Sequence, residues 1–178
     1  RSEAKEVITR LKELGVKRSV MLTGDKSVRA EAIAKEIGID EWHAELLPED
    51  KASIVKKLKD DGAKVAFVGD GINDAPSLAM SHTGISMSRG ADIARVTSDV
   101  ALLEDRLSLV CDAKEMANKT VKLVKTNYNL TLGANSFILL LAGMGVLNPV
   151  ATSLFHNGAT IGILLNALRG IRLEGEKL

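Results

Sequence analysis

The stretch "VAFVGDGINDAPSLAM", Val65–Met80, runs from a short apolar segment into two glycines, two aspartates and an asparagine within six positions. The apolar segment is typical of a buried strand. Gly69 and Gly71 let the backbone turn sharply after it, so that Asp70 and Asp74 can converge at the carboxyl end of the strand. Two carboxylates placed there suit Mg²⁺, which commonly takes one or two carboxylates together with phosphate oxygens and water.

The same segment also has an ordinary structural interpretation. Asp, Asn and Gly are common in turns and at helix N-termini, where a carboxylate caps the first backbone N–H groups. Asn73, between the two aspartates, can orient a ligand without adding charge. The segment alone therefore leaves a magnesium site and a capped turn as open alternatives.

A second apolar run, "SVMLT" (Ser19–Thr23), predicts another short buried strand, and Gly24 and Asp25 follow it directly. A hydroxyl together with free backbone N–H groups at a helix start can hold a phosphate. An ordinary helix N-cap is the structural alternative.

A lysine near the start of a predicted helix is the third feature. In "PEDKASIVKKLKDDG", Pro48 suits the first helical position and Gly62 the end. Lys51 lies in the first turn, where a lysine gains nothing from the helix dipole, so its position suggests an anionic ligand. A solvated surface lysine is the structural alternative.

Strand and helix signals alternate through the first hundred residues. A helix is predicted over Ser27–Ile37, ending at Gly38. Strands are predicted at 64–69, 83–87 and 99–103. This alternation favours a parallel sheet covered on both faces, with ligands bound at the carboxyl ends of the strands.

Composition restricts the classes of partner and of chemistry. The 178 residues carry a net charge of +1 and only 3% aromatic residues, which favours neither a nucleic acid nor an acidic partner. The single cysteine, Cys111, has no second cysteine for an internal disulfide, and a metal-binding role is not expected for it. His43 and His82 lie in polar segments and are expected at the surface.

The 43 residues from 126 to 168 contain no Asp, Glu, Lys or Arg. Asn148 and Pro149 divide them into apolar stretches at 130–147 and 150–168, each close to the length that spans a bilayer. Lysines precede the first stretch and arginines follow the second, which predicts two membrane spans with both ends in the cytoplasm. A pair of buried core helices in a soluble protein is the alternative.

Polar residues inside these stretches are the candidate transport ligands, because they are costly in a membrane. The candidates are Asn135 and Ser136 in the first stretch and His156, Asn157 and Thr160 in the second. The imidazole of His156 suits a divalent first-row metal better than Cu(I). An interhelical hydrogen bond is its structural alternative.

Three motifs together, "TGD" (23–25), "PEDK" (48–51) and "GDGINDAPSLA" (69–79), resemble the haloacid-dehalogenase-like fold and, more narrowly, the phosphorylation domain of P-type ATPases. The segment "TGISMSRGADIARVTSDVALLED" (83–105) is similar to the stretch that follows in that family. The resemblance implies that Asp70 and Asp74 bind Mg²⁺, that Thr23 contacts the phosphoryl group, and that Lys51 stabilises its charge. It assigns Gly24, Asp25 and Asn73 to the same catalytic site.

The resemblance also implies what this chain lacks. The phosphorylated aspartate of the family lies in a "DKTGT" motif, and neither that motif nor "TGE" occurs here. The chain therefore looks like the C-terminal part of a pump and is expected to be inactive alone. Two spans ending in "LNALRG" resemble the heavy-metal pumps.

Within the spans, the resemblance places Asn135 and the "HNGAT" segment at the metal-binding positions of those pumps, without the acidic or Met-Ser-Ser residues found there. Asn135 and His156 are therefore the expected contacts of the transported metal.

The sequence thus predicts an α/β haloacid-dehalogenase-like domain followed by a transmembrane helical hairpin. The expected divisions are 1–106 for the phosphorylation domain, 107–129 for a connecting helix, 130–168 for two membrane helices and 169–178 for a cytoplasmic tail. The expected function is ATP-driven, Mg²⁺-dependent transport of a divalent metal, most plausibly zinc, in a multi-pass cell-membrane protein. Its expected partners are lipid, the metal ion and the other pump domains, without nucleic acid. A soluble phosphatase of this fold and a silent membrane-anchored fragment are the alternatives.

Overall fold

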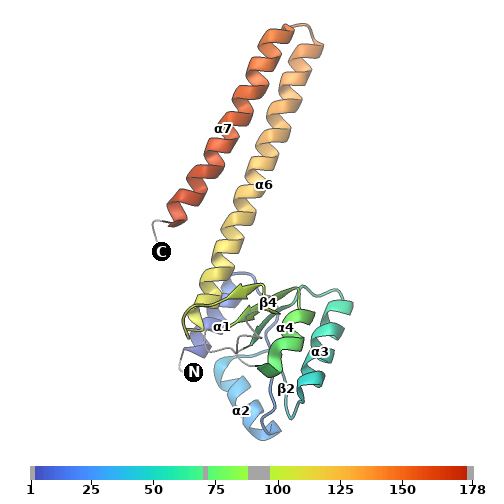
Figure 1. Ribbon diagram of the computed structural model, residues 1–178, viewed down its shortest axis with the longest axis vertical. Helices are drawn as coiled ribbons and strands as arrows, with labels where there is room; N and C mark the ends of the chain where they lie inside the picture. The colour runs from blue at the N-terminus through green and yellow to red at the C-terminus, as the bar shows by residue number, and fades with distance from the viewer. Residues whose placement is uncertain (1–2, 70–71, 88–96, 176–178) are drawn as a thin grey trace. The chain divides into compact units, whose positions relative to one another are not determined.

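The computed structural model describes residues 3–69, 72–87 and 97–175. The chain divides into two compact units, Arg1–Glu115 and Met116–Leu178, each of which is described by itself (Figure 1). The first is an α/β unit and the second is a pair of helices.

Helices and strands alternate through the α/β unit. In chain order they are α1 (Ala4–Glu13), β1 (Val20–Leu22), α2 (Ser27–Ile37), β2 (Glu41–His43), α3 (Pro48–Asp60), β3 (Ala66–Gly69), the 3₁₀ turn η1 (Ile72–Asp74), α4 (Ala75–Met80), β4 (Thr83–Ser86), β5 (Val100–Ala101) and the first turns of α6 (Ser108–Gly143).

Local sequence explains where two of these helices end or begin. α2 ends at Gly38, whose φ of +78° is the left-handed conformation that glycine adopts without strain. α3 begins at Pro48, and the Asp50 carboxylate accepts a hydrogen bond from the Leu47 N–H at 2.9 Å. The predictions for both helices are confirmed.

All strand pairs in the described residues are parallel. β1 pairs with β2, and β3, β4 and β5 pair in that order. The predicted parallel arrangement is therefore confirmed, although the predicted strands are longer than the observed ones. β2 was not predicted, and it places His43 in a strand beside Glu41, whose carboxylate lies 2.7 Å from His43 Nε2.

Helices cover both faces of the β3–β4–β5 sheet. Ile85 of β4 packs in one apolar cluster with Leu11 of α1 and Val110 of α6. The neighbouring Gly84 points the other way, and a Cβ there would lie 2.8 Å from the Leu78 carbonyl oxygen in α4. The two faces are therefore closed by α1 and α6 on one side and by α4 on the other.

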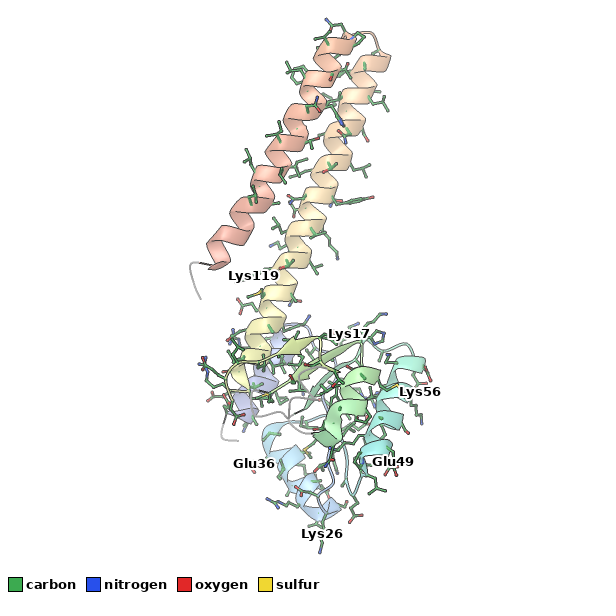
Figure 2. All side chains as sticks on the ribbon, in the orientation of Figure 1. Lys17, Lys26, Glu36, Glu49, Lys56 and Lys119 are labelled. Atoms are coloured by element: carbon green, nitrogen blue, oxygen red, sulfur yellow. The ribbon has the colours of Figure 1, made fainter. Side chains whose placement is uncertain are left out.

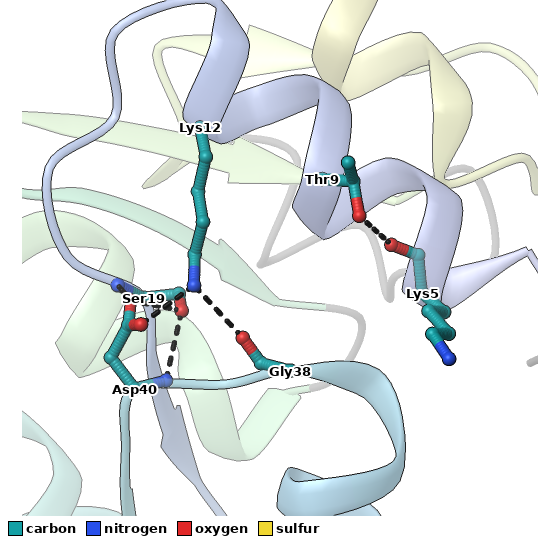
Figure 3. A network of polar contacts seen from close by, with 6 residues as sticks. All are labelled: Lys5, Thr9, Lys12, Ser19, Gly38 and Asp40. Atoms are coloured by element: carbon teal, nitrogen blue, oxygen red, sulfur yellow. Dashed lines mark hydrogen bonds and ion pairs between the residues drawn. The ribbon is translucent and has the colours of Figure 1, made fainter.

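A polar network joins α1 to the residues that directly precede β1 and β2 (Figure 3). Lys12 Nζ contacts Asp40 Oδ1 at 2.6 Å and donates to the Gly38 carbonyl oxygen at 3.0 Å. Asp40 Oδ2 accepts hydrogen bonds from the backbone and hydroxyl of Ser19. These contacts, the one from Lys12 above all, hold the pKa of the Asp40 carboxyl well below its usual range.

The second unit is an antiparallel hairpin of α6 and α7 (Pro149–Gly175) (Figure 1). Gly145, with φ of +73°, lies in the turn. Asn148 caps α7 by accepting the Ala151 N–H at 2.8 Å, as its position before Pro149 suggests. Among the described residues, no helix is both long enough and apolar enough to cross a membrane.

The hairpin is half-buried at some apolar positions and exposed at others. The half-buried positions include alanines on both helices, at 134, 142, 151 and 159. Large side chains are exposed on both helices, among them Leu139 at 73% and Leu154 at 72%. The half-buried positions of the hairpin also hold large apolar residues, among them Ile138, Leu141 and Ile163, so size does not separate covered from exposed positions.

Candidate functional site

The structure pairs two of the predicted site residues. Lys51, in the first turn of α3, donates from Nζ to Oδ1 of Asp74, the last residue of η1, at 2.9 Å. The side chains are only 17% and 12% exposed, so the pair is largely withdrawn from water. A lysine and a carboxylate 23 positions apart meet because α3 packs against η1 and α4.

This geometry argues against the structural alternative for each residue. Lys51 is not a solvated surface lysine, because it is mostly buried and ion-paired. Asp74 stands at the N-cap position of α4, but its side chain makes no capping hydrogen bond. The carboxylate binds Lys51 instead, so a capping role does not explain Asp74.

Gly69 explains how the strand end approaches this carboxylate. A Cβ at Gly69 would lie 2.8 Å from the Asp74 Cβ and 3.1 Å from its Oδ2. The first distance is shorter than real Cβ contacts allow, so only glycine fits. Asp74 is therefore held between the end of β3 and Lys51.

The Thr23 segment has its own hydrogen bonds at the ends of β1 and β2. Thr23 N–H donates to the His43 carbonyl at 3.0 Å, and the Thr23 carbonyl accepts the Leu46 N–H at 3.1 Å. The Thr23 hydroxyl oxygen accepts the Asp25 N–H at 3.1 Å, a turn within the loop. Thr23 is thus not the N-cap of α2, a position that Lys26 occupies.

The remaining predicted residues take different positions. Gly24 and Asp25 are exposed in the loop after β1, and Asn73 is exposed in η1. Asp70 and Gly71 lie outside the described residues. Within the described part of the chain, the hydrogen bonds and ion pairs do not link the Thr23 loop to Lys51 or Asp74.

The carboxylate of Asp74 is a suitable ligand for a hard cation. Oδ1 is paired with Lys51, while Oδ2 faces Gly69 and has no hydrogen bond among the described residues. A carboxylate oxygen of this kind suits Mg²⁺. Across residues 3–69, 72–87 and 97–175, however, no group of three His, Cys, Asp or Glu residues that could hold a metal comes together.

The hairpin brings together the two predicted transport residues. His156 Nδ1, on α7, lies 3.0 Å from Asn135 Oδ1, on α6. The interhelical hydrogen bond that was the structural alternative is therefore present. A second pair, Asn166 Nδ2 donating to Asn127 Oδ1 at 2.8 Å, also joins the helices. The sequence analysis did not single out Asn166, although it is a polar residue in the uncharged run.

Comparison with known proteins agrees with this picture. A family model of haloacid dehalogenase-like hydrolases matches residues 1–82. The chain is 44% identical over 177 residues to a zinc-exporting P-type ATPase of Mycobacterium marinum, an alignment covering 99% of this chain and 24% of that protein. It is 43% identical over 173 residues to a manganese-exporting P-type ATPase of Mycobacterium leprae, covering 97% and 24% respectively.

A solved structure is similar to almost the whole of this chain. The crystal structure of a zinc-transporting PIB-type ATPase in the E2.Pi state matches with a TM-score of 0.87 and 40% identity, covering 96% of this chain and 28% of that one. The chain thus spans about a quarter of the length of the curated relatives that it matches.

Proposed function

We propose that this chain, which belongs to the heavy-metal P-type ATPases, supplies part of the phosphorylation domain and a helical hairpin of an ATP-driven pump for a divalent transition metal. Alignment of nearly the whole chain with relatives named for zinc and manganese export supports this function. Because the chain spans about a quarter of those relatives, the activity is proposed for the longer protein to which it corresponds.

The observation that carries the proposal is the enclosed Lys51–Asp74 pair. A lysine and a carboxylate placed after the carboxyl end of a parallel strand lie where such sheets bind their ligands. The ammonium group of Lys51 is positioned to attract a phosphoryl group, and Oδ2 of Asp74 is left for a cation.

We assign Asp70 and Asp74 to Mg²⁺, which would neutralise charge on phosphoryl oxygens when bound. Thr23 Oγ1 accepts the Asp25 N–H, so its own hydrogen is free to be donated to a phosphoryl oxygen. Gly24 exposes its backbone beside that hydroxyl, and Asn73 is exposed next to Asp74. Lys51, Thr23, Gly24, Asp25 and Asn73 form the proposed catalytic set.

The aspartate that accepts the phosphoryl group is proposed to come from outside this chain, because the sequence contains no "DKTGT" motif. The strands support this. In the described residues, β1 pairs only with β2 and β3 only with β4, which leaves one edge of each strand unpaired. Val68 in β3 is 37% exposed, unusual for an apolar strand residue in the middle of such a fold.

We further propose that the hairpin lies in the cell membrane, with the α/β unit in the cytoplasm. The uncharged run over 126–168 supports a lipid environment. Large apolar side chains are exposed on both helices, among them Leu139 of α6 and Leu154 of α7, and such a surface suits contact with lipid. A soluble phosphatase would have to expose these large side chains to water.

The transported metal is proposed to pass beside His156 and Asn135. His156 is the one titratable side chain between Lys125 and Arg169 with a neutral form that binds metals. An imidazole nitrogen suits Zn²⁺ and other divalent first-row ions, and we propose zinc as the cargo.

Transport by the full-length protein in sealed vesicles tests the function. ATP should drive accumulation of radioactive zinc, and Asp74→Asn should abolish it. ATP-independent phosphatase activity of a protein that stays in solution without detergent, together with no zinc accumulation, would support the soluble alternative instead.

A further inference from the structure

The contact between α6 and α7 assigns different roles to the two residues of the proposed transport site. The short distance, 3.0 Å, joins His156 Nδ1 to the amide oxygen of Asn135. A carbonyl oxygen only accepts hydrogen bonds, so the hydrogen of this contact must belong to Nδ1. In a neutral imidazole the other nitrogen, Nε2, then keeps its lone pair.

Nε2 is the nitrogen left for a ligand. No hydrogen bond joins it to any residue that the structure describes. Histidines that bind metals commonly donate their other ring N–H to an oxygen, which fixes the tautomer and the ring orientation. Asn135 supplies such an oxygen to His156.

We propose that Asn135 is a positioning residue that holds His156 as the Nδ1–H tautomer and leaves Nε2 as the atom that binds the transported divalent metal. The metal-binding half of this inference rests on the proposed function. The tautomer half does not depend on it. Asn135 is then not itself a metal ligand, because its amide oxygen is occupied by the histidine.

The hairpin contains a matched control for this proposal. Asn166 Nδ2 donates to Asn127 Oδ1 at 2.8 Å, which is another amide contact between the same two helices. This pair has no imidazole, so its loss weakens the contact between the helices without touching His156 directly. A variant at Asn166 therefore separates hairpin packing from control of the histidine.

The tautomer is measured on this chain in detergent micelles. With nitrogen-15 in the histidines, protonated and unprotonated ring nitrogens give separate signals, and H156Q identifies those of His156. At about pH 8 an ordinary imidazole is neutral. The parent and Asn166→Leu should both show Nδ1–H, whereas Asn135→Leu should show a mixture of tautomers. Asn135→Asp, whose ionised carboxylate only accepts hydrogen bonds, should keep Nδ1–H.

Two results of this measurement would overturn the proposal. One is an Nε2–H tautomer in the parent chain, which would mean that the amide NH₂ of Asn135 donates to the ring. The other is an unchanged tautomer in Asn135→Leu, which would mean that Asn135 does not control it. Neither result bears on whether the full-length protein pumps metal.

The metal half is measured on the full-length pump with Zn²⁺ alone as the probe. Asn135→Leu should raise the zinc concentration for half-maximal ATPase stimulation about 10–100-fold, with a smaller effect on kcat. Asn135→Asp should recover much of this loss, and Asn166→Leu should stay near the parent. If Asn135→Leu and Asn166→Leu raise this zinc concentration equally, Asn135 contributes only to packing between the helices. A parent protein without zinc stimulation would contradict the proposed function itself.

Discussion

The ammonium nitrogen of Lys51 lies 2.9 Å from Oδ1 of Asp74, and this contact joins the first turn of α3 to the turn that follows β3. Both side chains are more than four-fifths covered. When one partner of such a pair is removed, the remaining charge is poorly solvated, so the pair contributes to stability as well as to the proposed chemistry.

We expect Lys51→Met to lower the free energy of unfolding of the α/β unit by about 1–3 kcal/mol, because it leaves the Asp74 carboxylate without its charged partner. Lys56→Met is the control, since Lys56 is on the same helix and exposed (Figure 2). Urea denaturation followed by circular dichroism measures both variants. Equal stability of the two would mean that the ion pair contributes nothing measurable.

Gly69→Ala should destabilise the same unit by about 1–3 kcal/mol, because the new Cβ would lie 2.8 Å from the Asp74 Cβ. Gly24→Ala should have a much smaller effect, because its Cβ would meet only the Leu46 carbonyl oxygen at 3.4 Å. Thermal melts of the two variants compare them directly. If Gly69→Ala has the same melting temperature as the parent, the end of β3 does not pack tightly against Asp74.

Two buried serines of the α4 region should respond in opposite directions to alanine. Ser77 is fully buried, and its hydroxyl has no hydrogen-bond partner among the described residues, so Ser77→Ala should stabilise the unit by about 1 kcal/mol. Ser81 is 8% exposed, and its hydroxyl donates to the Leu78 carbonyl at 2.7 Å. Ser81→Ala should therefore cost about 1 kcal/mol. Chemical denaturation of the two variants measures both effects. A loss of stability in Ser77→Ala would mean that the Ser77 hydroxyl makes a favourable contact.

The network around Asp40 should make stability depend on pH on the acid side. The pKa of Asp40 is lowered in the folded chain, first by the hydrogen bond from Lys12 and then by those from Ser19. A lowered pKa stabilises the fold above the ordinary value of 3.8, and this contribution is lost as the pH falls below it. In Asp40→Asn, the midpoint of unfolding should fall less steeply as the pH is lowered than it does in the parent. Asp60→Asn, at an exposed position, should behave like the parent. If the unfolding midpoints of the parent and of Asp40→Asn fall equally with decreasing pH, Asp40 does not have this role.

Local sequence signals were sufficient to predict much of the secondary structure of the α/β unit. Gly38 and Pro48 mark helix boundaries that the structure confirms, because backbone conformation at such positions depends on the residue itself. β2 was missed since its three residues include a glutamate and a histidine and give no apolar run. Its position depends on pairing with β1, which sequence periodicity does not reveal.

The contacts of the site depend on tertiary structure and were predictable only as a group. The motifs placed Lys51 and Asp74 near one site, but their direct ion pair depends on how α3 packs against η1. Asn166 was missed because its partner, Asn127, is fixed by the register of the hairpin. The division of the uncharged run at Asn148 was predictable because that residue caps α7.

Transfer of labelled γ-phosphate from ATP to the full-length protein tests the central proposal most directly. We expect Mg²⁺-dependent labelling of the parent and of Asp61→Asn, a control at the exposed C-cap of α3. We expect no labelling of Asp74→Asn, which removes a carboxylate charge with little change in volume. Labelling of Asp74→Asn at the level of the parent would contradict the assignment of this site to phosphoryl transfer.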